Sequence, residues 1–144
     1  MDLLDISLLS ESELDIKLAT DDRETHALFF TATWCDWYFK ESHPEISKNC
    51  TAAQESVNSF SIQYPNIVWH GVASRLWTGD KDLSDYRKKY AITHPLEIDK
   101  SNRLFHQYLV KDLPTLILIK NNKAVLKITD FNDKEKITKL LDEH

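Results

Sequence analysis

The chain has 144 residues, of which 42% are hydrophobic and 28% charged, and its net charge at pH 7 is −5. These values fit a single globular domain large enough to bury a core, and they exclude a general nucleic-acid-binding protein, which needs a basic face. Two glycines exclude a glycine-rich phosphate loop, and two cysteines exclude a disulfide-rich scaffold or a four-thiolate zinc site.

The N-terminal segment predicts a helical extension, residues 1–24, of a single domain that spans residues 1–144. Ser10 and Glu13 have the spacing of a capping box at the start of a helix. The first five residues are acidic and lack the charged-then-apolar order of a signal peptide, which indicates a cytoplasmic protein. A periplasmic chain whose export signal had been removed would look the same. No run of about 18 apolar residues occurs, so we expect no membrane span.

Apolar patterns and turn residues predict an alternation of strands and helices from residue 26 onward. Strands are expected at 26–33, 66–74, 95–99, 116–119 and 124–129, and helices at 35–63, 80–91, 102–108 and from Asn132 to the C-terminus. Asp80 is expected to cap the second of these helices, and Pro44 to bend or restart the first. The alternation predicts a mainly parallel sheet with an antiparallel hairpin at one edge and helices on both faces.

The end of the first strand is where chemistry is expected. Cys35 follows the strand at a turn, between Trp34 and Trp37, and begins a predicted helix. Unpaired N–H groups at a helix start stabilise a thiolate, whereas the neighbouring carboxylate of Asp36 would raise the pKa of the thiol. The position favours a functional thiol over a cysteine that only packs in the core.

This segment resembles the active-site turn of the thioredoxin-like superfamily, in which an apolar strand runs into Trp-Cys-x-x-Cys. Tyr38 stands where the second cysteine of that motif would be. Val110 to Thr115 resembles the second signature of the superfamily, a Val-x-x-x-Pro-Thr turn into a strand. The resemblance implies a thioredoxin-like fold over residues 25–143, with a cis Leu113–Pro114 bond beside the cysteine. Residues 80–99 resemble the insertion of TlpA-like and peroxiredoxin-like members.

Cys50 is the only internal thiol that could replace the missing cysteine. It lies 15 positions after Cys35, about 22 Å along an unbroken helix, whereas a disulfide needs Cα atoms about 4.4–6.8 Å apart. The two could pair only if the helix broke near Pro44 and folded back. Otherwise Cys50 is a small buried apolar residue, which is the more common outcome for a lone helical cysteine.

Two functions are consistent with these features. The resemblance implies a thiol–disulfide oxidoreductase of the redoxin type that acts through Cys35, with or without Cys50, on protein or peptide thiols and disulfides, as a monomer without a cofactor. Substrate contacts are expected at Trp34, Asp36, Trp37, Tyr38, Leu113 and Pro114. The alternative is a redox-inactive thioredoxin-like module that binds peptides beside Pro114 and the tryptophans.

Two other chemistries are less favoured. A peroxidatic role for Cys35 lacks the Thr-x-x-Cys spacing, since residue 32 is alanine. A metal site built from Cys35, Cys50, His43 and His94 has no pair of residues at a known ligand spacing.

Overall fold

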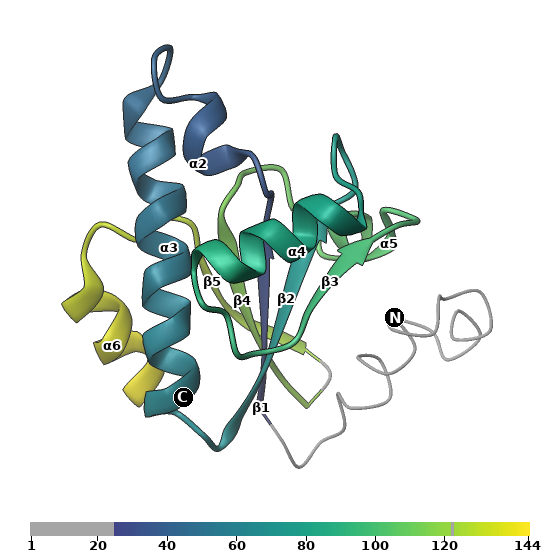
Figure 1. The fold of residues 1–144 in the computed structure, drawn as a ribbon. Helices are drawn as coiled ribbons and strands as arrows, with labels where there is room; N and C mark the ends of the chain where they lie inside the picture. Colours follow the sequence, from purple (N-terminus) through teal and green to yellow (C-terminus); the bar gives the residue numbers. More distant parts are fainter. Residues whose placement is uncertain (1–24, 122) are drawn as a thin grey trace.

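The computed structural model describes residues 25–121 and 123–144, and Figure 1 shows its fold. The predicted N-terminal helix falls outside the described residues. The elements in chain order are β1 (Thr25–Thr31), α2 (Cys35–Tyr38), α3 (Pro44–Gln63), β2 (Ile67–Ser74), α4 (Asp80–Lys89), β3 (Leu96–Asp99), α5 (Arg103–Gln107), β4 (Thr115–Lys120), β5 (Lys123–Ile128) and α6 (Lys134–Asp142).

Five strands form one mixed sheet in the order β3-β2-β1-β4-β5. β1 pairs in parallel with β2, and β2 with β3, whereas β4 runs antiparallel to both β1 and β5. β1 is the central strand, and its residues from His26 onward are buried, as its continuous apolar run predicts. The predicted mixed sheet with a late antiparallel hairpin is confirmed.

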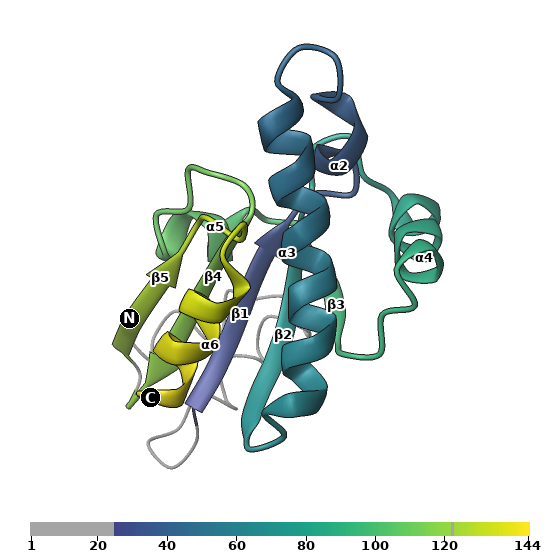
Figure 2. The same ribbon diagram turned by 90° about the vertical axis from the view of Figure 1, so that its left-hand side faces the viewer.

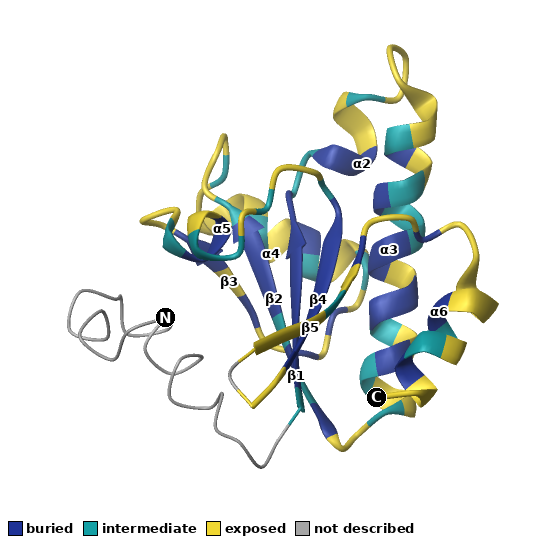
Figure 3. Ribbon diagram, turned by 180° about the vertical axis from the view of Figure 1, so that it is seen from behind, coloured by how far each residue is buried: buried dark blue, intermediate teal, exposed yellow. Residues whose placement is uncertain are grey.

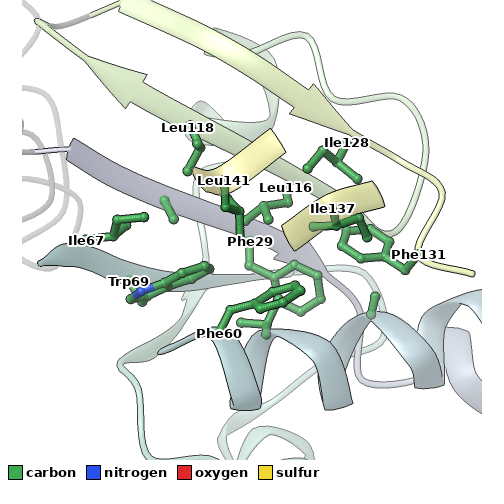
Figure 4. Close-up of a cluster of buried hydrophobic side chains, with 13 residues drawn as sticks. Phe29, Phe60, Ile67, Trp69, Leu116, Leu118, Ile128, Phe131, Ile137 and Leu141 are labelled. Carbon is green, nitrogen blue, oxygen red and sulfur yellow. The ribbon is translucent and has the colours of Figure 1, made fainter. Parts of the chain in front are cut away.

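Helices cover both faces of the sheet. Side chains of α3 and α6 pack on one face around Phe29, Phe60 and Leu116, as Figure 4 shows. On the other face, Leu104 and Phe105 of α5 pack against Leu28 and Phe30 of the central strand and their neighbours. α4 packs near the β3 edge (Figure 2), where Tyr86 contacts the buried residues of β2 and β3. Figure 3 shows the resulting buried layer, with β1 and β4 largely enclosed between helices.

The predicted helices differ from the structure in one break and two caps. The helix expected over 35–63 is two helices, α2 and α3. The final helix is capped by Asp133, whose carboxylate accepts the N–H of Lys136 at 3.1 Å, one residue later than predicted. Asp80, the predicted cap of α4, is its first helical residue; Gly79 is the N-cap, and its N–H donates to the carboxylate of Asp82 at 2.8 Å. In the described part of the chain, no helix has the length and apolar content needed to cross a bilayer.

Gly71 gives the first testable prediction. A Cβ at Gly71 would lie 2.7 Å from Leu96 Cδ1 and 3.0 Å from His94 Cε1, so alanine overpacks the contact between β2 and β3. We expect Gly71→Ala to lower the free energy of unfolding by about 1–3 kcal/mol, measured by urea denaturation. Gly79→Ala is the matched control, because a Cβ there meets only Asp82 at 3.6 Å. Equal losses for the two variants would contradict the packing argument.

Candidate functional site

The site is built on the short segment of residues 32–43, which connects β1 to α3 and contains the helix α2. α2 has four residues, Cys35–Tyr38, and the chain turns back over residues 39–43 before α3 begins at Pro44. Proline is favoured at the first position of a helix, because its missing N–H would be unpaired there anyway. The residue before a proline also disfavours helical geometry, and His43 has φ −141° and ψ 72°. Of the two outcomes expected at Pro44, a bend or a restart, the structure has the restart, and residues 35–63 form two helices.

This turn brings the two cysteines together. Cys35 and Cys50 form a disulfide with Cα atoms 6.0 Å apart. Cys50 lies six residues into α3, about 9 Å along the helix axis, and α2 packs beside this end of α3 (Figure 1). The preferred prediction for Cys50, an unpaired small apolar residue, was wrong because it assumed an unbroken helix.

Both cysteines are completely buried, with 0% of their surface exposed. They form a small cluster with Ala32, against which the partly exposed Trp34, Ile46 and Leu113 pack. The hydroxyl of Thr31, at the end of β1, lies 3.9 Å from Cys35 Sγ and is within hydrogen-bonding distance of this sulfur. Solvent therefore does not reach the disulfide in this conformation.

Leu113, which is distant from both cysteines in the sequence, packs beside the disulfide. The Leu113–Pro114 peptide bond is cis, and Leu113 packs against the cysteine cluster while Pro114 is buried. The hydroxyl of the next residue, Thr115, donates to the carbonyl of Asp112 at 2.6 Å, so this hydrogen bond joins the two ends of the turn. The structure thus brings Cys35, Cys50, Trp34 and Leu113 into one cluster.

Asp36 faces α4 and takes no part in the cysteine cluster. Its Oδ2 accepts from Lys89 Nζ at 2.6 Å and from the Tyr90 hydroxyl at 2.5 Å, and its side chain is 1% exposed. Its Oδ1 has no hydrogen-bond partner among the described residues. Burial and the hydrogen bond to Asp36 raise the pKa of Tyr90, so the phenol stays protonated at neutral pH and donates to the carboxylate. Asp36, one of the predicted substrate contacts, thus forms a buried link between α2 and the C-terminal end of α4 in this structure.

Aromatic side chains surround the turn on its solvent side. Trp37 and Tyr38 are 59% and 49% exposed, and Trp77, in the loop between β2 and α4, is 64% exposed. The rings of Trp34 and Trp77 lie 5.4 Å apart, and those of Tyr38 and Trp77 lie 5.5 Å apart. The Trp34 indole N–H also donates to the carbonyl of Leu76 at 2.8 Å, which fixes this loop to the turn. Trp77 was not among the predicted site residues, because it lies 42 residues along the chain from Cys35 and no local sequence pattern links the two.

The two histidines considered as metal ligands have other partners in the structure. His43 is exposed near Glu45, with 3.8 Å between Nδ1 and Oε1. His94 is buried, with Nδ1 2.8 Å from the Pro95 carbonyl oxygen and Nε2 3.2 Å from the Gln54 amide nitrogen. Burial lowers the pKa of His94 and keeps its ring neutral. Within residues 25–121 and 123–144, no three His, Cys, Asp or Glu side chains are grouped so as to hold a metal ion.

Comparison with known proteins identifies the class of protein. A thioredoxin of Chlorobaculum thiosulfatiphilum is 30% identical over 76 residues, which are 53% of this chain and 70% of that protein. A thioredoxin of Chlamydia trachomatis is 41% identical over 49 residues, 34% of this chain and 48% of that protein, so the chain spans about half the length of this relative. No protein-family model matches the chain.

Solved structures share the fold. A secreted Mycobacterium tuberculosis disulfide oxidoreductase, described as homologous to E. coli DsbE, has a TM-score of 0.68 and 13% identity, covering 88% of this chain and 86% of that one. A thiol:disulfide interchange protein DsbE from Chlorobium tepidum has a TM-score of 0.66 and 21% identity, covering 88% and 83%. The exposed lipoprotein thioredoxin Etrx1 of Streptococcus pneumoniae has a TM-score of 0.64 and 22% identity, covering 88% and 90%.

These findings define the chain as an α/β protein with a thioredoxin-like fold. The chain belongs to the thioredoxin-like family, and its structural neighbours are of the DsbE and redoxin type.

The link between Asp36 and Lys89 gives the second prediction. Lys89→Met leaves the buried carboxylate without its cation, so we expect the free energy of unfolding to fall by about 1–2 kcal/mol. In an Asp36→Asn background no charge remains to be balanced, and the same substitution should cost less than about 0.5 kcal/mol. Urea denaturation of the four proteins measures the coupling. Lys88→Met, which removes an exposed neighbouring lysine on α4, should change stability by less than about 0.5 kcal/mol. An equal cost of Lys89→Met in both backgrounds would refute the link.

Proposed function

We propose that this chain is a thiol–disulfide oxidoreductase in which Cys35 and Cys50 are the redox pair. The observation that carries the proposal is the Cys35–Cys50 disulfide beside Leu113, the residue that precedes the cis proline. In this proposal Cys50 replaces the second cysteine of Trp-Cys-x-x-Cys, whose position is occupied by Tyr38. We also infer that α4 and β3 correspond to the insertion of TlpA-type members, which the DsbE-type neighbours support.

The exchange follows from the chemistry of two thiols. In the reduced protein, the Cys35 thiolate attacks one sulfur of a substrate disulfide, forms a mixed disulfide and releases the other substrate sulfur as a thiolate. The Cys50 thiolate then attacks Cys35 Sγ, releases the second substrate thiolate and forms the internal disulfide. Two electrons pass from the protein to the substrate, and the released thiolates take protons from water. The reverse sequence oxidises a substrate dithiol.

Cys35 is assigned the attack because of its place in the chain. It is the first residue of α2, just after the central strand β1 and next to the exposed Trp37 and Tyr38, whereas Cys50 is a buried residue within α3. Since both sulfurs are buried, a substrate gains access when the partly exposed Trp34, Ile46 or Leu113 moves away from them. The backbone groups of Leu113 are the ones we propose for pairing with the substrate as an added strand. Trp34, Trp37 and Tyr38 form the rest of the proposed contact face, and Asp36 does not belong to it.

A second function is favoured by the complete burial of the disulfide. Catalytic thiols are usually partly exposed, and inert structural cysteines are buried. In that case the disulfide joins α2 to α3 permanently and stabilises the fold by about 3 kcal/mol, the chain-entropy value for a loop of this length. The chain would then be a redox-inactive module that binds proteins through Trp37, Tyr38 and the surface beside Pro114.

Single serine variants separate the two functions and give the third prediction. If Cys35 attacks and Cys50 resolves, Cys50→Ser should accumulate a mixed disulfide with a model substrate, and Cys35→Ser should not. Both variants should reduce insulin no faster than the buffer control, because each lacks one of the two steps. Trapping is read on a non-reducing gel and by intact mass, with the double serine variant as the control for folding.

The reduction potential supplies the deciding measurement. Structural disulfides typically have potentials below about −300 mV, whereas catalytic pairs of the thioredoxin and disulfide-isomerase types lie between about −270 and −120 mV. A potential above about −300 mV, together with trapping through Cys35, supports the oxidoreductase. A lower potential with no insulin reduction would eliminate it and leave the binding module.

A further inference from the structure

An open pocket lies beside the disulfide turn and has a volume of about 670 Å³. Its walls come from the turn and α2, from Trp77 in the loop after β2, and from α4. The volume falls within the usual range for sites that hold a small molecule or a side chain. Trp34 lines the pocket and also packs against the Cys35–Cys50 cluster, whereas the two cysteines and Leu113 do not line the pocket.

Three aromatic rings form one wall of the pocket. The rings of Trp34, Tyr38 and Trp77 contact one another pairwise, with centroids 5.4 to 5.6 Å apart. The Trp34–Trp77 and Trp34–Tyr38 pairs are edge-to-face, so the rings are turned at steep angles to one another. The face of an aromatic ring carries negative electrostatic potential and attracts a cation within about 6 Å. A cluster of angled rings open to solvent is therefore suited to surround a positively charged side chain.

The part of the pocket lining that comes from α4 carries carboxylates. Asp82 and Asp85 of α4 line the pocket together with Lys89. The charge of Lys89 is balanced by the buried carboxylate of Asp36, 2.6 Å away. Lys81 pairs with Asp85 at 3.2 Å, but both side chains are mostly exposed, so this pair is weak. The residues that line the pocket therefore include two carboxylates and one ammonium group, and the ammonium group is already paired with Asp36.

We propose that this aromatic–acidic pocket binds an arginine side chain of the protein whose disulfide the chain exchanges. The identity of that partner rests on the proposed function, whereas the pocket and its charge do not. A guanidinium group is planar, stacks on aromatic rings and donates to carboxylates in a fork, so it complements both walls at once. Trp34 lines the pocket and directly precedes Cys35 in the chain. A substrate segment whose arginine occupies the pocket therefore has its own cysteine close to Cys35.

Binding is tested first with peptides that cannot exchange disulfides. A Gly-Ser peptide with a single arginine is compared with its twin in which neutral citrulline replaces arginine, using calorimetry on the oxidised full chain. We expect the arginine peptide to bind at least about fivefold more tightly, and the difference to shrink when the salt concentration rises from 0.05 to 0.5 M. Since neither peptide contains cysteine, the result is independent of any redox activity. Equal affinities, or equal salt dependence, would overturn the proposal.

Variants locate the binding. Asp82→Asn with Asp85→Asn keeps the shape of the wall and should remove the advantage of arginine over citrulline. Trp77→Ala should weaken the arginine peptide because one ring of the cluster is lost. Glu97→Gln with Glu135→Gln removes the same two units of charge at exposed positions on β3 and α6 outside the pocket and should leave the difference intact. If this glutamate pair has the same effect as the aspartate pair, the pocket is not the site.

A second pair of peptides tests the link to disulfide exchange. Each carries one cysteine, as a mixed disulfide with a small thiol, next to the arginine or the citrulline, and its reduction by the reduced chain is followed. We expect the arginine peptide to react at least about fivefold faster, in proportion to its affinity. Equal rates together with unequal affinities would show a partner site unrelated to the exchange. No reaction of either peptide would reject the proposed function and leave the binding result standing.

Discussion

The break between α2 and α3 is the constraint on which the rest of the site depends. A helix continuing from Cys35 would carry Cys50 about 22 Å away. Because Pro44 begins a new helix after a short turn, the chain instead returns beside its starting point, and the two Cα atoms lie 6.0 Å apart. One proline at the first position of α3 thus decides whether the second cysteine is a partner or a core residue.

Three interactions fix the segment of residues 32–43, which connects β1 to α3, to its neighbours. The disulfide joins it to α3, the Asp36 carboxylate joins it to Lys89 of α4 and to Tyr90, which caps that helix, and the Trp34 indole joins it to the loop after β2. Since each link comes from a different residue of one short segment, α2 has little freedom to tilt. Trp37 and Tyr38 of this helix are exposed to solvent, and the three links restrict their movement. An exposed aromatic surface of this kind is typical of a binding site.

The sequence predicted the strands well because the buried strands carry continuous apolar runs, as in residues 26–33 and 116–119. It predicted the helix caps less well, since Asn132 and Asp133 are equally good caps by composition and only the path of the chain chooses between them. The cysteine pairing could not be predicted, because Pro44 fits both the bend of one helix and the start of another. Trp77 and Lys89 were missed for a related reason: they reach the site only through the packing of α4 beside β3, which no local pattern reports.

The long separation of the two cysteines has a consequence of its own. In a Cys-x-x-Cys pair, the disulfide closes a ring of very few residues, and breaking it frees little of the chain. Here the ring contains the whole of α2 and the turn before Pro44, so reduction removes one of the three links that hold this surface. In the reduced chain, only the ion pair to α4 and the hydrogen bond of the Trp34 indole still fix α2 in place. If Cys35 and Cys50 cycle, the aromatic surface is held more firmly in the oxidised chain than in the reduced one, and a partner that binds to it distinguishes the two states by that difference.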